Sequence, residues 1–242
     1  METLLEKIAK TAEPDARAGR IFAFELGRID FTLCHELQDA LQNLRIAGEI
    51  SDVILFAEHN PVYTITKHTD ASHLLYSEAE LAQRGIVLAP VDRGGDITFH
   101  GPGQIMGYPI INLKTNKLNV RKYIDLLEDV IIGALEQLGI KGGKNRDARG
   151  VWISNRKIAA LGVRITRYVT KHGFALNNDV ELDFFKGIIP CGIADKAVTS
   201  IKQEIGKVVE RRKLVEMLIS QFQNTLNREV EPLIDCSTRS HD

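Results

Sequence analysis

The sequence predicts a mixed α/β domain of the α+β kind, in which an antiparallel-rich mixed sheet is packed with helices. Segments whose apolar residues recur at helical spacing are separated by runs of several consecutive strands, an order typical of that class. The 242 residues are 44% hydrophobic and 26% charged, which suffices for a large core without disulfides or metals. No internal repeat or linker divides the chain.

The first half of the chain is predicted to hold two helices and five strands. Asp30 can cap a helix that ends near Gly48. The sequence Ser77-Glu-Ala-Glu80 is a capping-box signature for a short helix that ends at Gly85. Apolar runs between turn residues predict strands at 52–57, 62–66, 86–91, 96–100 and 105–113.

The second half is predicted to hold two longer helices around a hairpin. Asn119 caps a helix whose apolar stripe ends at Gly139. Strands at 150–154 and 157–165 flank a tight turn, and a strand at 169–177 extends the same sheet. A last helix over about 208–226 buries apolar residues that recur at helical spacing, namely Leu214, Leu218, Phe222 and Leu226.

We expect three parts along the chain. Residues 1–19 form an N-terminal extension, either a short helix or a mobile tail rather than core, because they are charged and end in a stretch with Pro and Gly. Residues 20–230 form one catalytic domain, and residues 231–242 form a polar C-terminal tail. The N-terminus lacks a signal-peptide core, and no stretch approaches the ~18 apolar residues of a membrane span, so we expect a cytoplasmic protein.

Charge and cysteine content argue against several classes of protein. The net charge of −1 lacks the basic excess of nucleic-acid binding, so we expect neither nucleic acid nor membrane as a partner. Three cysteines, Cys34, Cys191 and Cys236, are an odd number with no close-spaced pair, which argues against a disulfide framework and a zinc knuckle. Cys34 lies on the apolar face of its helix and fits an inert thiol, and Cys236 lies in the polar tail.

The segment from Arg93 to Asn112 places several glycines among strand-forming residues. Each glycine weakens a strand, so we expect something to approach this backbone closely. His100 in this segment can be a structural histidine, a metal ligand or a substrate contact. Metal is the weakest option, because the histidines show no paired spacing. The glycines also lack the spacing of a phosphate loop or a dinucleotide fingerprint.

Cys191 lies between Pro190 and Gly192, in a turn that would expose its sulfur to a cleft. A free thiol is only a few per cent ionised at pH 7, so a nucleophilic cysteine needs a cationic or basic neighbour. The candidates for that neighbour are Lys157, Lys186, Lys196 and His172. Lys157 is favoured because it opens an apolar strand, and a lysine there tends to lie at the mouth of a core. An inert cysteine and a solvated lysine remain the alternatives.

Several segments, in this order, resemble one enzyme family. They are Arg93-Gly-Gly-Asp-Ile-Thr-Phe-His-Gly-Pro-Gly-Gln104, Gly150-Val-Trp-Ile153, Lys157-Ile-Ala-Ala-Leu-Gly162, His172-Gly-Phe-Ala-Leu-Asn177 and Gly187-Ile-Ile-Pro-Cys-Gly192. The set resembles the lipoyl(octanoyl) transferases, and the resemblance runs from about Phe24 to Glu204. That family shares a fold with biotin- and lipoate-protein ligases, which implies a mixed sheet and helices around an acyl tunnel. The stretch from Tyr63 to His68 departs from the family pattern, and the extended N-terminus has no clear family counterpart.

The resemblance implies an acyl transfer from a carrier protein. An octanoyl group would pass from octanoyl-acyl carrier protein to a lysine of lipoyl domains in 2-oxoacid dehydrogenase complexes and the glycine cleavage H protein. Cys191 would be the acyl-accepting nucleophile and Lys157 its activating partner, with no cofactor and no metal. The residues implied to bind substrate are Arg93, Gly94, Gly95, Asp96, Ile97, Thr98, Phe99, His100, Ala160, Leu161, Gly162, Gly173, Phe174 and Ala175.

Three other functions are weighed against this one. An ATP-dependent lipoate- or biotin-protein ligase on the same fold would not need Cys191. A non-catalytic module that docks lipoyl or carrier domains would not need Lys157 and Cys191 together. A Cys-His thiol hydrolase would need an Asn or Asp that orients His100 or His172, and the sequence does not identify one.

Overall fold

The computed structural model describes residues 3–14, 19–145, 148–189 and 197–237. The helices are α1 (Leu4–Thr11), α2 (Phe31–Ala47), α3 (Glu78–Gln83), α4 (Val120–Glu136), α5 (Ile201–Ile205) and α6 (Arg211–Leu226), with 3-10 helices η1 (Ala71–His73) and η2 (Leu182–Gly187). The strands are β1 (Ile21–Arg28), β2 (Asp52–Glu58), β3 (Val62–Thr66), β4 (Val87–Val91), β5 (Thr98–His100), β6 (Gln104–Ile110), β7 (Gly143–Lys144), β8 (Val151–Ile153), β9 (Arg156–Thr166), β10 (Val169–Asn177) and β11 (Ile234–Asp235).

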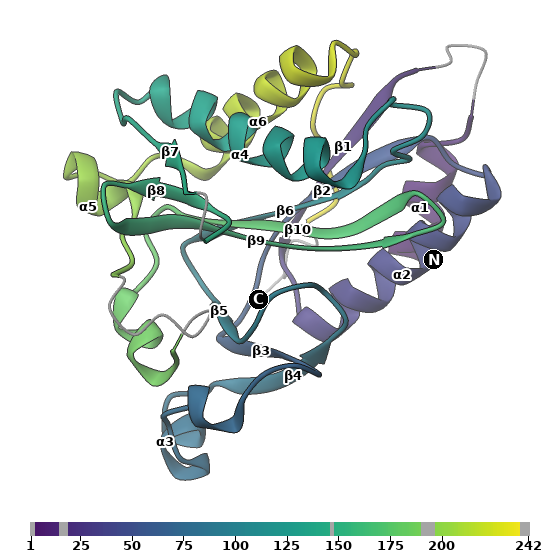
Figure 1. The fold of residues 1–242 in the computed structure, drawn as a ribbon. Helices are drawn as coiled ribbons and strands as arrows, with labels where there is room; N and C mark the ends of the chain where they lie inside the picture. Colours follow the sequence, from purple (N-terminus) through teal and green to yellow (C-terminus); the bar gives the residue numbers. More distant parts are fainter. Residues whose placement is uncertain (1–2, 15–18, 146–147, 190–196, 238–242) are drawn as a thin grey trace.

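A large mixed sheet forms the centre of the molecule, and a small sheet lies against its lower side with α3 (Figure 1). The large sheet has the order β11-β1-β2-β6-β10-β9-β8-β7, and the small sheet has the order β4-β3-β5. In the large sheet β1 pairs in parallel with β2 and β11, while the other pairings are antiparallel. The predicted class, an antiparallel-rich mixed sheet with helices, is therefore confirmed.

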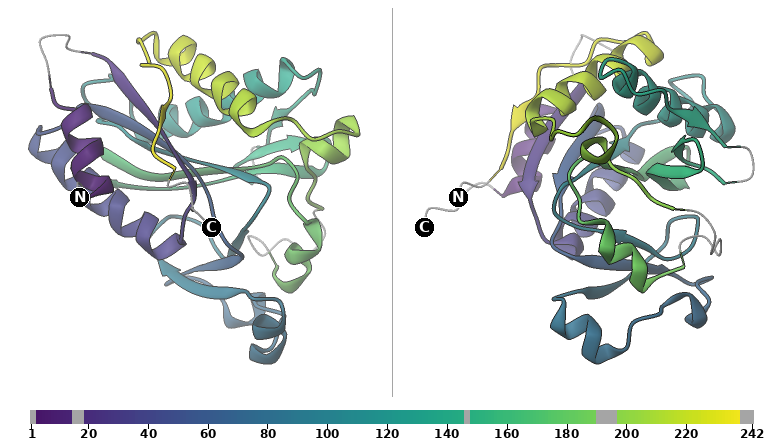
Figure 2. Two further views of the ribbon diagram at one scale, coloured as in Figure 1. Left: turned by 180° about the vertical axis from the view of Figure 1, so that it is seen from behind. Right: turned by 90° about the vertical axis from the view of Figure 1, so that its left-hand side faces the viewer.

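Helices cover both faces of the large sheet. Figure 1 shows α4 and α6 on one face and α1 and α2 on the other, and the views from behind and from the side in Figure 2 agree. Each face has its own apolar cluster. The larger cluster contains Tyr123 and Leu127 of α4 and Phe222 of α6, and the second contains Leu41 of α2. The large sheet thus has an apolar core on each of its two faces.

The N-terminal helix α1 belongs to the second apolar cluster. The capping box of Thr3 and Glu6 starts it, and Ile8 and Ala12 are fully buried against α2. The expectation that this segment lies outside the core is wrong for these residues. Apolar residues at Leu4, Ile8 and Ala12 recur every fourth position, a helical stripe that the charged composition obscured.

The described part of the C-terminal tail, residues 231–237, extends the large sheet. β11 pairs in parallel with β1, with Phe24 opposite Ile234. The backbone N–H of Cys236 donates to the carbonyl oxygen of Glu25 at 2.7 Å, and Cys236 is buried. The expectation of a polar tail is therefore wrong for this stretch, whose apolar residues are too few to form a recognisable strand pattern.

The predicted starts of α2, α3 and α4 are confirmed, whereas α4 ends at Glu136, three residues before the predicted Gly139. Asp30 and Asn119 cap α2 and α4 through their side chains, and Gly48 ends α2 in a left-handed conformation. The last helix, α6, starts about one turn later than predicted, because Glu210 accepts hydrogen bonds from the first backbone N–H groups of the helix.

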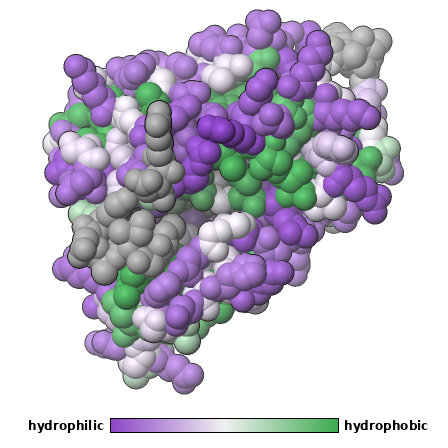
Figure 3. Space-filling view, in the orientation of Figure 1, coloured by the Kyte–Doolittle hydropathy of each residue, from purple (hydrophilic) through white to green (hydrophobic). Residues whose placement is uncertain are grey.

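Surface polarity is uneven on the face seen in Figure 1. Figure 3 shows this face covered mainly by hydrophilic residues, with an apolar patch in the region of β9 and α4. Val163 and Ile165 of β9 are only partly buried against the larger core cluster, and Val120 at the start of α4 is half exposed. Among the residues that the structure describes, no helix combines the length and the apolar character that crossing a membrane requires.

Candidate active site

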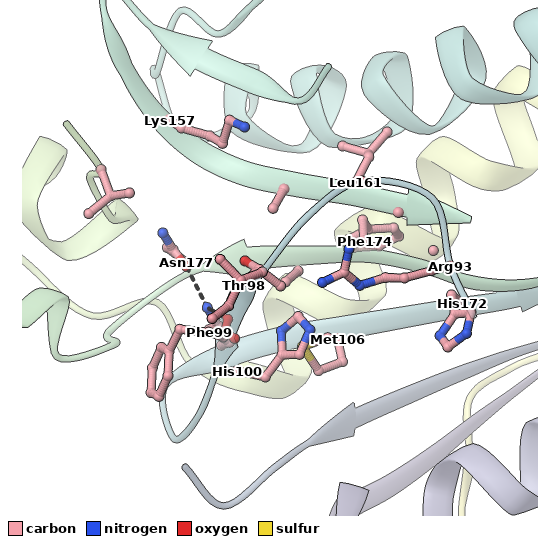
Figure 4. Close-up of a pocket in the computed structure, with 18 of the residues that line it drawn as sticks. Arg93, Thr98, Phe99, His100, Met106, Lys157, Leu161, His172, Phe174 and Asn177 are labelled. Atoms are coloured by element: carbon pink, nitrogen blue, oxygen red, sulfur yellow. Dashed lines mark hydrogen bonds between the residues drawn. The ribbon is translucent and has the colours of Figure 1, made fainter. Parts of the chain in front are cut away.

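A long pocket lies where the small sheet, β6, β9 and β10 meet (Figure 4). It encloses about 980 Å³ of space including its solvent-facing mouth. The sequence-predicted residues that line it are Lys157, Arg93, Gly95, Asp96, Ile97, Thr98, Phe99, His100, Ala160, Leu161, Gly162, Gly173, Phe174 and Ala175. Residues from three separate motifs are thus brought to one cavity. Gly94 alone is not among the lining residues, and its N–H donates to the carbonyl oxygen of Val163 at 3.0 Å.

The floor of the pocket is a ladder of small and apolar residues on β9 and β10. Ala160 lies opposite Ala175, Leu161 opposite Phe174 and Gly162 opposite Gly173. A Cβ on Gly173 would lie 2.1 Å from the carbonyl oxygen of Gly107 on the next strand. Glycine is therefore required there by close approach of the chain itself.

The glycines after His100 also serve internal packing. A Cβ on Gly101 would lie 2.3 Å from the ring of Phe99, and one on Gly103 would lie 2.5 Å from the backbone of Asp179. Gly103 has φ +85°, which favours glycine independently. The expected close approach to this backbone is real, but at these two positions the approaching groups belong to the protein.

Arg93 connects the loop before β5 to the small sheet through hydrogen bonds. Its guanidinium donates to the Thr64 hydroxyl at 2.8 Å, and to the carbonyl oxygens of Asp96 at 2.7 Å and Gly94 at 3.0 Å. Its side chain also lies within 2.7 Å of where a Cβ on Gly162 would be. Arg93 therefore shapes the wall of the pocket as well as facing it.

His100 is buried at the centre of the pocket wall. Its ring stacks on Phe31 with centroids 6.1 Å apart, and its Nδ1 atom has no hydrogen-bond partner among the described residues. Burial lowers the pKa of His100 well below its usual value, so the imidazole is neutral at pH 7. A buried neutral nitrogen without a partner is available to a bound ligand.

A second buried histidine was not singled out from the sequence. His59 Nδ1 lies 2.8 Å from the carbonyl oxygen of Ile29, so this nitrogen carries the proton. His59 Nε2 then accepts from the hydroxyl of Tyr108, 2.7 Å away, and Tyr108 lines the pocket. Burial lowers the pKa of His59 to about 4. The only sequence signal was its position before Asn60 and Pro61, which reads as a turn.

Lys157 lies at one end of the pocket, at the start of β9 (Figure 4). Its Nζ atom lies 4.9 Å from the ring centroid of Trp152, whose indole N–H donates to the carbonyl oxygen of Ala148 at 2.9 Å. The backbone N–H of Lys157 donates to the carbonyl oxygen of Ala197, and its carbonyl accepts from Thr199. Lys157 is half buried, at the mouth of the core as the sequence indicated.

Cys191 and Lys196 lie outside the described residues. Ala197 and Val198, which follow Cys191 closely in sequence, line the pocket beside Lys157. Lys186, another candidate partner for the thiol, has an exposed side chain and pairs with Asp183 at 2.8 Å.

The last candidate partner, His172, lies at the end of the pocket opposite Lys157 (Figure 4). Its Nε2 donates to Asp92 Oδ1 at 2.9 Å, so an orienting carboxylate does exist for this histidine. The pair of His172 and Asp92 lies at the far end of the pocket from Lys157. Activation of the Cys191 thiol by His172 and its activation by Lys157 would therefore require the thiol at opposite ends of the pocket.

The two described cysteines are poor nucleophiles. Burial raises the pKa of Cys34 to about 12, and burial also raises the pKa of Cys236. The prediction of an inert Cys34 on the apolar face of α2 is consistent with both its burial and its protonated state.

One cluster has the residue types of a metal site. His35, Asp92 and His172 bring ligand atoms within 4.8 Å of one another. The Lys171 ammonium lies 3.1 Å from Asp92 Oδ1 and 3.3 Å from His35 Nε2, and it also pairs with Asp39. This ammonium supplies the positive charge that a metal ion would bring to the cluster, so the donor set does not fit a cation.

Other lining residues were missed by sequence reasoning. They are Phe31, Gln104, Met106, Tyr108, Trp152, Asn177, Phe185, Ala197 and Val198. Two of them connect the pocket to the segment after Cys191. Asn177 donates to the carbonyl oxygen of Thr199 and accepts from Gln104, both at 2.9 Å. Gln104 and Asn177 are the last residues of the motifs from Arg93 to Gln104 and from His172 to Asn177, and that position was their sequence signal.

Known proteins are similar to this chain over most of its length. A family model described as the lipoyl protein ligase A/B catalytic domain matches residues 30–223. An octanoyltransferase of Koribacter versatilis (strain Ellin345) is 44% identical over 207 residues, which cover 84% of this chain and 82% of the relative.

Solved structures show the same fold at low identity. Lipoate-protein ligase A bound with ATP has a TM-score of 0.68 at 14% identity, with 89% of each chain covered. Biotin protein ligase from Aquifex aeolicus in complex with biotin and ATP has a TM-score of 0.55 at 16% identity, covering 85% of this chain and 70% of the other.

The chain is an α+β domain with the fold of lipoate-protein ligase A and biotin protein ligase, and its apolar pocket has a lysine at one end. Among proteins of this fold, the chain belongs to the lipoyl protein ligase A/B catalytic-domain family.

Proposed function

We propose that the protein is an octanoyltransferase, which moves an octanoyl group from octanoyl-acyl carrier protein to a lysine of lipoyl domains. The observation that carries the proposal is an apolar pocket with the Lys157 amine at one end, next to the residues that follow Cys191. The name of the 44% identical relative supports the choice of acyl group.

The first half-reaction is an exchange of thioesters. The Cys191 thiolate attacks the carbonyl carbon of the donor, a new carbon–sulfur bond forms, and the bond to the carrier's sulfur breaks. The departing thiolate takes the proton that Cys191 lost, with Lys157 as the relay. Two thioesters have nearly equal free energies, so this step needs no ATP.

The second half-reaction makes an amide. The amine of the acceptor lysine attacks the Cys191 thioester, and neutral Lys157 accepts the proton that the amine loses. The Cys191 thiolate leaves and is reprotonated. An amide is more stable than a thioester, which drives the cycle forward.

The apolar lining supplies binding energy for the acyl chain. Ile97 and Phe99 are fully buried, and Leu161 of β9 and Phe174 of β10 are also among the lining residues. Burying the seven carbons beyond the carbonyl stabilises the complex by roughly 5 kcal/mol at ~0.8 kcal/mol per methylene.

The competing function is activation of a free acid by ATP. The ligases of similar fold are only 14% and 16% identical to this chain, so they bear on the fold and not on its reaction. A protein that only docks lipoyl domains is the other alternative. A reaction that proceeds without ATP distinguishes the octanoyltransferase from the ligase. Covalent acylation of the protein distinguishes it from a protein that only docks lipoyl domains.

The test is the intact mass of the protein after mixing with octanoyl-acyl carrier protein without ATP. We expect one octanoyl adduct that hydroxylamine removes and that a lipoyl domain takes over. Cys191→Ala should form no adduct, while Cys34→Ala and Cys236→Ala should form it normally. A lipoyl domain that gains an octanoyl group only with octanoate and ATP would favour the ligase instead.

A further inference from the structure

His172 interrupts the regular backbone of β10. Its φ is +56°, in the left-handed region that residues with a Cβ seldom adopt. The strand stays in register with β9 on both sides, with Gly173 opposite Gly162 and Lys171 opposite Arg164. A non-glycine residue keeps this conformation only where its surroundings enforce it, and such positions cluster at functional sites.

The left-handed residue changes where two side chains point. In a regular strand, consecutive side chains lie on opposite faces. Here Lys171 Nζ and His172 Nε2 both reach Oδ1 of Asp92, at 3.1 and 2.9 Å. Both side chains are only 4% exposed. The backbone conformation therefore brings the imidazole and the ammonium to the same carboxylate.

On one side, the His172 imidazole contacts a network of ion pairs centred on Asp92. Asp92 is also 3.6 Å from His35 Nε2 and 3.7 Å from Arg164 Nε. The His35 and His172 rings pack with centroids 5.0 Å apart. On its other side, the imidazole faces the pocket.

With the acyl carbonyl at the row of Ala160 and Ala175, the distance to His172 matches the length of an octanoyl chain. Three residue steps separate the row of Ala160 and Ala175 from the row of His172. At ~3.3 Å per residue these steps cover roughly 10 Å. Staggered carbon–carbon bonds of ~1.5 Å advance ~1.25 Å each, so an extended eight-carbon chain spans about 9 Å.

We propose that His172 is the end wall of the acyl pocket and determines the length of the chain that the protein accepts. The inference rests on the proposed octanoyl transfer. A longer chain would have to push the imidazole off Asp92 and place methylenes against buried charges, which is unfavourable. Asp92 holds the ring in place, and the left-handed backbone aims it at the pocket.

The test is His172→Gly. Glycine adopts φ +56° without strain, so the backbone of β10 is preserved while the ring is removed. The measurement is kcat/KM with octanoyl-, decanoyl- and dodecanoyl-acyl carrier protein. Since one methylene in an apolar pocket changes kcat/KM by tenfold or more, we expect the decanoyl-to-octanoyl ratio to rise about tenfold over wild type. His172→Asn, which also tolerates this backbone, should give a smaller rise and carries the same test if the glycine variant does not fold.

Tyr168→Gly is the matched control. Tyr168 also has positive φ, +69°, at the tip of the β9–β10 hairpin, but it is 63% exposed and does not line the pocket. The decanoyl-to-octanoyl ratio of kcat/KM in Tyr168→Gly should equal that of wild type. Equal rises in both variants would mean that looser backbone is the cause and would overturn the proposal, as would an active His172→Gly protein with an unchanged ratio. A wild-type protein that takes no octanoyl group would instead overturn the proposed function, and the end-wall role with it.

Discussion

The two ends of the pocket hold their charges differently. At one end the Lys157 Nζ atom lies over the Trp152 ring, 4.9 Å from its centroid, in a half-buried position. At the other end the side chains of Lys171 and His172 are only 4% exposed, and they share Asp92, a carboxylate that is 48% exposed. An aromatic face attracts a cation but cannot take its proton, whereas a carboxylate fixes it. The first end therefore presents an amine beside an aromatic face, and the second presents an imidazole that a carboxylate holds in place.

The largest expected effect comes from removing the amine at the first end. Lys157→Met keeps much of the apolar stem but neither charge nor base, so we expect octanoyl transfer to fall by about a thousandfold. Alkylation of Cys191 at pH 7 should slow as well.

Lys157→Arg separates the two roles of the amine. Guanidinium keeps the charge but cannot accept a proton in the working range, so alkylation should persist while turnover falls. Near-normal transfer by this variant would limit Lys157 to an electrostatic role and weaken the contrast between the ends.

The buried histidines along the pocket should make the protein acid-sensitive. Burial lowers the pKa of His59 to about 4 and lowers the pKa values of His100 and His172. Between pH 6.5 and 4 the unfolded chain binds more protons at His59, so the free energy of unfolding falls with pH, by about 3 kcal/mol at most from this residue. Glu128, whose pKa burial raises, acts in the opposite direction.

Urea unfolding at pH 7 and pH 4.5 measures this loss. His59→Gln should reduce the difference between the two pH values, because one group that charges on unfolding is removed. A difference that is the same in both proteins would mean that His59 charges in the folded state and that the wall of the pocket is wetter than its burial indicates.

A smaller effect is expected from the ring under Lys157. Trp152→Leu removes a cation–π contact worth about 1 kcal/mol, so octanoyl turnover should fall roughly fivefold. Trp152→Phe keeps an aromatic face and should lose less. If Leu and Phe give equal rates, the ring acts only as apolar filling at that end.

The smallest expected effect comes from relieving backbone strain at Tyr168, which lies away from the pocket. Tyr168 has φ +69° at an exposed hairpin tip, so Tyr168→Gly should raise the free energy of unfolding by about 0.5–1 kcal/mol. Thermal unfolding should show a Tm about 2 °C higher. A lower Tm would indicate that the tyrosine side chain packs more usefully than its exposure suggests.

The fold was predictable where local signals were strong. The caps at Asp30, Ser77 and Asn119 and the apolar stripes of the long helices placed α2, α3 and α4. β1 was missed, although it is central to the parallel part of the sheet. β11 was missed because a two-residue strand has no period of its own, and its pairing with β1 depends on contacts distant in sequence.

The residues of the candidate site were likewise predictable only where the local sequence signal was strong. Residues in contiguous motifs, such as Arg93 and Lys157, were found because several unusual residues stand together. Phe31 was not found, since it is the one residue of α2 that lines the pocket while the other apolar residues of this helix form the core. Tyr108 was not found, since it lies on β6, a strand that is buried along its whole length. Which strand lies beside which decides their role, and a single sequence does not determine strand order.

The pairing of β1 with the C-terminal segment has a consequence for folding during synthesis. β1 begins at Ile21, but its outer edge is hydrogen-bonded by residues 229–236. At roughly 5–20 residues per second, the ribosome needs tens of seconds to make the intervening two hundred residues. Through that interval the nascent chain presents an unpaired strand edge, which can pair with other chains. The outer edge of β1 is therefore covered only after residues 229–236 have been made.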